Sequence, residues 1–347
     1  MSPRQTEQQI TARHPRETTE LFGHREAEAA LLNAYRSGRI PHAWLIGGAR
    51  GIGKATLAYR MARFVLSHVS PLGDNVRRAE TLAVDPSNPI ARQVAAGAHG
   101  GLLTLERSLN DKGVMRSVIT VDETRETISF FGSTAAVDGW RVCVVDTVDE
   151  LNPNAANALL KVLEEPPQHS LFLLVSHAPA RVLPTILSRC RKLLLRPLAV
   201  DDVIQAASRA ADLAADDAAL LEAAEAAEGS VARALTLLGG DALKLQQRTA
   251  ALLSTLPRLD PRELHALGDA LSGSDRVALT AFVDSVDRWV SERLRADACD
   301  NANLPRLARL AEVWEKINRA ARDAETYNLE RKPLVFSVFG LLAEATQ

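Results

Sequence analysis

The chain has 347 residues and a formal net charge of −2, from 41 Lys and Arg against 43 Asp and Glu. At about 150 residues per domain, this length predicts two or three domains and excludes a small disulfide-stapled scaffold. The hydrophobic share of 46% and charged share of 24% exclude a disordered chain. The balance of charge also excludes a whole-chain basic field, so contact with nucleic acid has to come from a local patch or a partner.

Composition and cysteine usage indicate a mostly helical protein of a reducing, cytoplasmic environment. Aromatic residues make up only 4%, and Ala and Leu recur throughout, which favours helix packing. Cys143, Cys190 and Cys299 are widely spaced and offer neither a disulfide framework nor a metal-binding knuckle, so we expect no metal site and read them as packing residues. The N-terminus is polar and no run of about 18 apolar residues follows, so we expect no membrane segment.

In chain order, residues 1–20 read as a frayed polar tail and residues 21–37 as a helix. A short apolar strand at 43–46 then enters a glycine-rich loop, and helical periodicity follows the loop. Further strands are predicted at 102–105, 140–146, 171–176 and 192–198, and helices at 122–131 (N-cap Asp122), 152–165 and 182–189. This alternation predicts an α/β fold with a parallel sheet and helices on both faces. Residues 68–101, rich in Gly, Pro and Asp, are predicted to be an irregular insertion.

From residue 199 onward only helical periodicity remains. Helices are predicted at 201–213, 217–227 and 230–238, and a further all-helical block runs from about residue 242 to the end. The predicted division is therefore a polar tail over 1–20, an α/β domain over 21–198, a small helical domain over 199–240 and an all-helical domain over 241–347.

The loop after the first strand has the spacing GxxxxGK of a phosphate loop. Its glycines and lysine are Gly48, Gly51, Gly53 and Lys54. Such glycines let backbone N–H groups turn toward a phosphate, which the lysine and the following helix N-terminus neutralise. The alternative is a glycine-rich turn with a solvated lysine. The position expected to give a hydroxyl to Mg²⁺ is Ala55, and Thr56 lies about 100° further around the helix.

The strand ending at Asp146 resembles a Walker B element, whose carboxylate would hold Mg²⁺ at the carboxyl edge of the sheet. The next residue is Thr147, where many ATPases of this type carry a glutamate that activates water. Asp149 and Glu150 are close by in sequence, and we interpret them as a helix cap and a solvated charge rather than as replacements for that base.

Four stretches carry a resemblance to a known family: AWLIGGARGIGKATLAYRMARFVL (43–66), NALLKVLEEPP (157–167), LFLLVSHAPARVLPTILSRC (171–190) and GSVARAL (229–235). They resemble the delta-prime family of bacterial clamp-loader subunits of DNA polymerase III, within the AAA+ superfamily. The resemblance covers about residues 20–240, and the run from 322 to 345 is similar to the end of the collar domain of that family. It implies a RecA-like AAA+ domain, a helical lid and an all-helical collar used for oligomerisation.

The resemblance also implies roles for individual residues. Arg189, in the motif Ser-Arg-Cys, would act in trans as an arginine finger on ATP bound by a neighbour, whereas the alternative reading is an arginine that caps a helix C-terminus. Ser176 stands at the sensor 1 position and His177 beside it reads as a polar edge residue. The sensor 2 position holds Ala232, with Arg233 one residue further along. Together with Ala55 and Thr147, this predicts weak ATP binding, with Mg²⁺ as a possible companion of the nucleotide, and little or no hydrolysis.

The function implied is a stationary subunit of a clamp loader, which uses ATP to place a sliding clamp on primed DNA in replication. Its implied partners are the delta and gamma or tau subunits of a hetero-oligomer, with the clamp and DNA reached through the complex. Relatives often carry a four-cysteine zinc module after the first helix, but residues 68–120 contain no cysteine, so no zinc is expected. The alternatives are an active ATPase motor subunit of the same loader, and an independent AAA+ protein that remodels DNA or protein.

Overall fold

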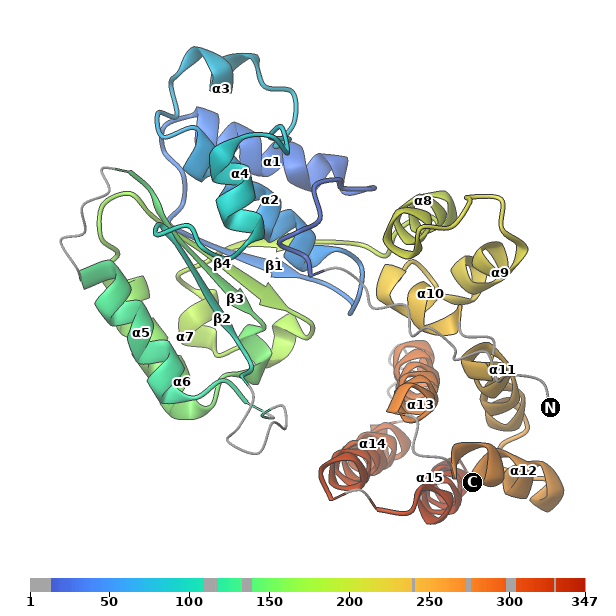
Figure 1. Ribbon diagram of the computed structural model, residues 1–347. Coiled ribbons are helices and arrows are strands. Elements are labelled where there is room, and N and C mark those ends of the chain that lie inside the picture. The colour runs from blue at the N-terminus through green and yellow to red at the C-terminus, as the bar shows by residue number, and fades with distance from the viewer. Residues whose placement is uncertain are drawn as a thin grey trace. The chain divides into compact units, whose positions relative to one another are not determined.

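The computed structural model describes residues 14–108, 116, 118–132, 139–238, 241–272, 276–297, 304–327 and 329–346. The chain divides into two compact units, one spanning Thr11–Arg233 and the other including Ala234–Gln347. Each is shown in Figure 1 and is described here by itself. No helix among the described residues is long and apolar enough to cross a membrane. The predicted boundaries at 198/199 and 240/241 stay predictions.

A parallel sheet in the order β2-β3-β4-β1-β5 forms the centre of the first unit. Its strands are β1 (Ala43–Gly47), β2 (Leu102–Glu106), β3 (Arg141–Asp146), β4 (Ser170–Ser176) and β5 (Arg191–Leu194). In the register, Gly47 lies opposite Ser176, and Asp146 lies opposite Glu106. The ends of β1, β2, β3 and β4 therefore meet at one edge of the sheet, which is where ligands of open α/β sheets bind.

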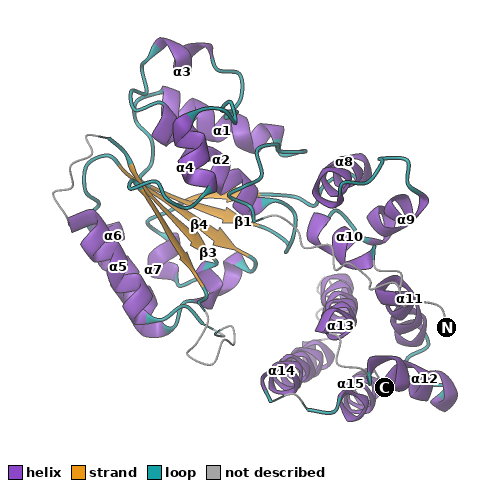
Figure 2. Cartoon of the chain, in the orientation of Figure 1, coloured by secondary structure: helices purple, strands orange, loops and turns teal. Residues whose placement is uncertain are grey.

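Helices cover both faces of this sheet, as the alternation of strands and helices predicted (Figures 1 and 2). Because side chains alternate along a strand, Trp44 and Ile46 of β1 join one apolar cluster and Ala43 and Leu45 join the other. The first cluster includes residues of α1 (Arg25–Arg36), α2 (Lys54–Ser67) and α4 (Pro89–Ala95), and the second residues of α5 (Val121–Gly132), α6 (Pro153–Glu164) and α7 (Pro184–Leu187). Short 3-10 turns η1 (Val148–Glu150) and η2 (Pro179–Arg181) follow β3 and β4.

Helix α5 begins one residue earlier than predicted, so Asp122 lies in its first turn and is not the N-cap. The Glu123 carboxylate accepts hydrogen bonds from the backbone N–H and the hydroxyl of Thr120, at 2.6 and 2.9 Å. The helix start is thus closed by the side chain of Glu123.

Residues 68–101 are not the irregular insertion that the sequence predicted. They contain α3 (Asp74–Arg78) and α4, whose N-cap is Asn88. Val76, Leu82 and Val94 are at most 1% exposed and belong to the apolar cluster on the α2 face of the sheet. The Glu28 carboxylate of α1 accepts the N–H of Leu82 at 2.9 Å. This segment is therefore held by apolar contacts and side-chain hydrogen bonds.

Residues 14–20, the described end of the predicted polar tail, lie along α2, and we call them the N-terminal strap. Two arginines of α2 hold its carbonyls: Arg60 donates to Thr19 at 2.5 Å, and Arg63 donates to Arg16 at 2.7 Å. Arg63 is only 1% exposed. The strap is polar but its backbone is fixed, because buried guanidinium groups require acceptors and the strap supplies them.

Helices α8 (Val200–Ala211), α9 (Ala218–Ala226) and α10 (Val231–Leu237) follow β5 within a few residues of the predicted ranges. Asp217 is the N-cap of α9 and accepts the N–H groups of Ala219 and Leu220. Helix α10 begins in the first unit and its later residues belong to the second.

The described part of the second unit is helical. It contains α11 (Asp241–Ser254), α12 (Pro261–Leu271), α13 (Arg276–Asp297), α14 (Leu304–Thr326) and α15 (Arg331–Thr346). Its core contains Phe282 and Phe339, both 0% exposed. Asp287 of α13 accepts hydrogen bonds from the indole of Trp314 and the amide of Asn318 on α14, at 2.7 and 2.9 Å, so a polar contact fixes how these two helices pair.

Candidate functional site

The glycine-rich loop between β1 and α2 has the backbone of a phosphate cradle. The φ angles of Gly48, Gly51 and Gly53 are 149°, 76° and 93°, which side chains with a Cβ rarely adopt. A Cβ at Gly53 would meet no heavy atom within 4 Å, so the loop is open there. Helix α2 starts at Lys54 and directs its first N–H groups at this loop.

Lys54 is 3% exposed and its ammonium group is bonded to the loop itself. It donates to the carbonyl of Gly48 at 2.8 Å and to that of Ala49. Burial lowers the pKa of Lys54 to about 8, with the charges of Asp146 and Asp149 acting in the opposite direction. The alternative of a solvated lysine is thus excluded, and the ammonium lies in the cradle near two carboxylates.

The N-terminus of α10 contacts the middle of the loop. The N–H of Val231 donates to the carbonyl of Gly51 at 2.9 Å. A Cβ at Gly51 would lie 2.3 Å from the hydroxyl of Ser230 and 2.8 Å from the Cβ of Ala232, the residue at the predicted sensor 2 position. Ala232 is therefore brought to the loop, but it carries no charge for a phosphate. Arg233 is directed elsewhere, 3.8 Å from Glu228.

Asp146 at the end of β3 lies beside a carboxylate that the sequence analysis did not select. The register places Glu106, the last residue of β2, directly opposite Asp146. Burial, and next the charge of Glu106, raise the pKa of Asp146, while the charges of Lys54 and His14 act against this shift. The strap supplies His14, whose ring nitrogen lies 3.2 Å from the Glu106 carboxylate. The sequence could have indicated Glu106, because it is an acidic residue directly after a predicted strand.

A hydrogen bond joins Ser176, the last residue of β4, to Asp149 of η1. The hydroxyl of Ser176 donates to Asp149 at 2.8 Å, and the N–H of His177 donates to the other oxygen of the same carboxylate at 2.5 Å. Asp149 is thus neither a helix cap nor a solvated charge. His177 follows β4 directly and is half-buried, and burial lowers its pKa to about 3.

Two further predictions near β3 are changed by the structure. Glu150, interpreted as a solvated charge, forms an ion pair with Arg107 at 2.9 Å. Thr147 is 3% exposed, and its hydroxyl has no hydrogen-bond partner among the described residues. The position that carries a glutamate in many ATPases is therefore occupied by a short buried side chain.

These residues fit the phosphates of a nucleotide better than they fit a hydrolytic Mg²⁺ site. The open backbone at Gly53, the buried Lys54 and the start of α2 suit a phosphate. For the cation, Asp146 would be one ligand, but Ala55 offers no hydroxyl. No group of three or more His, Cys, Asp or Glu in the described part of the chain is placed to hold a metal ion.

Arg189 follows α7 directly after its C-cap, Ser188, and is remote in sequence from the loop. Its Nη1 donates to the carbonyl of Thr185 at 2.8 Å and to the hydroxyl of Ser188 at 3.3 Å, and its Nη2 donates to Glu164 at 2.7 Å. The contact with Thr185 is the helix-capping contact given as the alternative reading. The side chain nevertheless stays 32% exposed, so the guanidinium can reach a group outside the chain.

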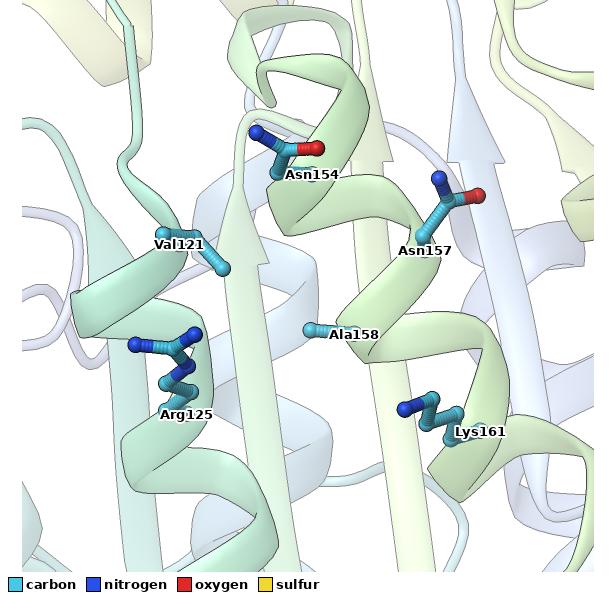
Figure 3. Close-up of a pocket in the computed structure, with 6 residues that line it drawn as sticks. All are labelled: Val121, Arg125, Asn154, Asn157, Ala158 and Lys161. Carbon is cyan, nitrogen blue, oxygen red and sulfur yellow. The ribbon is translucent and has the colours of Figure 1, made fainter.

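A second concave feature lies between α5 and α6, with a volume of about 410 Å³. Figure 3 shows Arg125 on one helix and Asn154, Asn157 and Lys161 on the other. The remaining lining residues are Val121 and Ala158. The lining holds two cations and two amides and no carboxylate, although Arg125 also donates to Asp122 at 3.1 Å. Its donors suit an anion. We call it the α5–α6 groove.

The two cysteines that the structure describes have no part in these sites. Cys143 is fully buried on β3, as predicted, and burial raises its pKa. Cys190 follows Arg189 and burial raises the pKa of its thiol to about 12, so it is not a nucleophile. Cys299 lies outside the described residues.

The site combines a glycine loop between β1 and α2, a carboxylate at the end of β3 and a helix N-terminus that contacts the loop. These features define a P-loop protein with the AAA+ α/β fold. The comparison with protein families gives the family as well. The chain belongs to the family described as DNA polymerase III, delta subunit, whose model matches residues 23–199, just over half of the chain.

Individual relatives agree with this family. The DNA polymerase III subunit tau of Escherichia coli is 31% identical over 258 residues, which cover 72% of this chain and 38% of tau. The DNA polymerase III subunit delta' of Pseudomonas aeruginosa is 37% identical over 149 residues, which cover 43% of this chain and 41% of that subunit. The chain therefore matches less than half of the length of either relative.

Among solved structures, a DNA polymerase III gamma subunit-related protein of Thermotoga maritima is similar over 91% of this chain and 99% of that chain. The sequence identity is 14% and the TM-score is 0.44, so the similarity between the two structures is low.

Proposed function

We propose that this chain is a delta-prime-like, stationary subunit of a clamp loader that places a sliding clamp on primed DNA by using ATP. Its partners in the hetero-oligomer are delta and gamma or tau subunits. The chain presents Arg189 to ATP bound by a neighbouring subunit and binds ATP weakly itself, with little or no hydrolysis.

The observation that carries this proposal is the contrast between Arg189 and the chain's own nucleotide site. Arg189 is partly exposed, and hydrogen bonds to Thr185 and Glu164 hold its guanidinium in place. This arrangement suits a guanidinium that binds a phosphate of another chain. At the glycine loop, by contrast, Thr147 replaces the usual base and Ala55 the usual Mg²⁺ ligand. Trans arginine fingers contribute about 10³ to 10⁵ in rate, so a subunit without its own turnover still accelerates hydrolysis in a neighbour.

The α5–α6 groove supports contact with the DNA backbone. The whole chain has a net charge of −2, so binding to phosphates depends on a local cluster of cations. Arg125 and Lys161 supply that cluster, and Asn154 and Asn157 supply amide donors beside it. Contacts with phosphates position a protein on DNA without recognising the base sequence. Loading a clamp at any primed site requires this kind of contact.

An active motor subunit is the competing function, and the intact glycine loop with its buried Lys54 is the observation in its favour. It predicts ATPase activity of the isolated chain that is lost in Lys54→Ala. The stationary role predicts no such activity above background.

The deciding experiment measures DNA- and clamp-stimulated ATPase of a reconstituted loader that contains the wild-type chain or Arg189→Ala. Arg92→Ala, an exposed arginine of α4, serves as the matched control. Equal assembly is checked first by gel filtration. We expect turnover to fall in Arg189→Ala and to stay unchanged in Arg92→Ala. Unchanged turnover in Arg189→Ala would refute the finger role.

A further inference from the structure

We propose that Glu164 is a positioning residue. Its carboxylate holds the guanidinium of Arg189 until a phosphate of the neighbour's nucleotide replaces the carboxylate. This inference rests on the proposed function of Arg189. Glu164 is the last residue of α6, and Arg189 follows the short helix α7, so two separate elements meet in this pair.

The contacts of Arg189 divide into a fixed side and an exchangeable side. Nη1 is bound to Thr185 and Ser188, which belong to its own helix end and move with it. Nη2 is bound to the Glu164 carboxylate at 2.7 Å. At most three of the five N–H groups of the guanidinium are engaged by these contacts. The backbone carbonyl therefore sets the orientation of the group, and the carboxylate occupies the position that another anion can take.

A phosphate is a stronger partner for this position than the carboxylate. It offers three oxygens and more negative charge, and guanidinium matches it with paired hydrogen bonds. The Glu164–Arg189 pair is weak by comparison, because 50% of the Glu164 side chain and 32% of the Arg189 side chain are exposed to water. The pair is strong enough to restrict the rotamers of a long side chain, and weak enough to be displaced.

The carboxylate also reduces the positive charge that Arg189 presents to the outside. Exchange of Glu164 for the neutral amide Gln keeps the shape and the acceptor but removes the competing charge. An exposed ion pair changes an equilibrium by up to about fivefold. Glu164 competes with the phosphate for Arg189 both when ATP is bound and in the transition state of hydrolysis. Removing this competition therefore lowers the KM for ATP and leaves kcat unchanged.

The chain provides its own matched control in the next residue. Glu165 has the same side chain and is also exposed, and among the described residues it forms no ion pair. Glu165→Gln changes the net charge of the surface by the same amount as Glu164→Gln. A general electrostatic effect on the complex therefore appears in both variants, and the positioning effect in Glu164→Gln alone.

The test compares ATPase kinetics of the loader reconstituted with wild type, Glu164→Gln, Glu165→Gln, Arg189→Ala and the double variant Glu164→Gln/Arg189→Ala, each with clamp, primed DNA and confirmed assembly. We expect Glu164→Gln to lower the KM for ATP about two- to fivefold at unchanged kcat, and Glu165→Gln to match wild type. The double variant is expected to equal Arg189→Ala.

Two results overturn the positioning role while the finger role stands: the same KM in Glu164→Gln and Glu165→Gln, or an effect of Glu164→Gln that persists without Arg189. A loss of kcat in Glu164→Gln also overturns it, because the carboxylate would then be needed in the transition state. Unchanged turnover in Arg189→Ala defeats the proposed function itself, and with it this inference.

Discussion

The contact between α10 and the glycine loop leads to a quantitative prediction for Gly51→Ala. The new Cβ would lie 2.3 Å from the hydroxyl of Ser230 and 2.8 Å from the Cβ of Ala232, so the start of α10 has to move. Gly53→Ala is the matched control, because its Cβ would meet nothing within 4 Å. Both glycines have a positive φ, at 76° and 93°, so both variants carry backbone strain.

The magnitude follows from these two contributions. An L-residue at positive φ costs about 1–2 kcal/mol. Displacing packed atoms costs about 1–3 kcal/mol more. We therefore expect Gly53→Ala to reduce the free energy of unfolding by about 1–2 kcal/mol and Gly51→Ala by about 2–5 kcal/mol. The additional loss in Gly51→Ala is expected to be concentrated where α10 begins, since the hydrogen bond from Val231 to Gly51 is disturbed as well.

Amide hydrogen exchange read by mass spectrometry is the suitable assay, because it resolves local opening within a chain of two units. The peptide that contains residues 228–233 should exchange faster in Gly51→Ala than in Gly53→Ala. Peptides of α13 and α14 should not change in either variant. Equal exchange of residues 228–233 in the two variants would show that α10 does not rest on the loop.

Three shorter predictions follow from other contacts. Arg60→Ala leaves the buried Glu28 without its ion-pair partner at 2.6 Å, so we expect a loss of about 3–5 kcal/mol in urea unfolding; a loss below about 1 kcal/mol would contradict a buried pair. The folded pKa of His177 is lowered to about 3 from an ordinary value near 6.5, so unfolding takes up a proton as the pH falls through this window. Stability should drop by about 2 kcal/mol from pH 7.5 to pH 5, and His177→Gln should flatten this dependence. Lys161→Ala should reduce DNA stimulation of the loader and weaken the salt dependence of DNA binding, whereas Lys332→Ala, in α15, should change neither.

The sequence was sufficient for the sheet and for the position of the glycine loop between β1 and α2. Buried parallel strands appear as short continuous apolar runs, and a glycine loop between a strand and a helix has few other structural explanations. Helix and strand ends were predicted within a few residues. The predicted N-cap of α5, Asp122, was wrong because the side chain that caps this helix belongs to Glu123, which lies inside the helix rather than before it.

What the sequence could not show were contacts between segments distant in the chain. The N-terminal strap looks like a polar tail because it contributes backbone carbonyls, which no residue pattern reveals, to two buried arginines of α2. Residues 68–101 looked irregular for a related reason. Only a few apolar residues, such as Val76 and Leu82, anchor them, and these are too widely spaced to form a periodic pattern.

Three of the polar side chains at the carboxyl edge of the sheet are already paired within the chain. Lys54 is bound to the glycine loop, Ser176 to Asp149, and Glu106 to His14 of the strap. A nucleotide with its cation has to replace several of these contacts, and Ala55 and Thr147 offer nothing in return. The contacts of Arg189, by contrast, lie at a surface where a single exchangeable carboxylate, Glu164, has to move. The free-energy cost of engaging a phosphate is therefore lower at Arg189 than at the chain's own loop, as the proposed stationary role predicts.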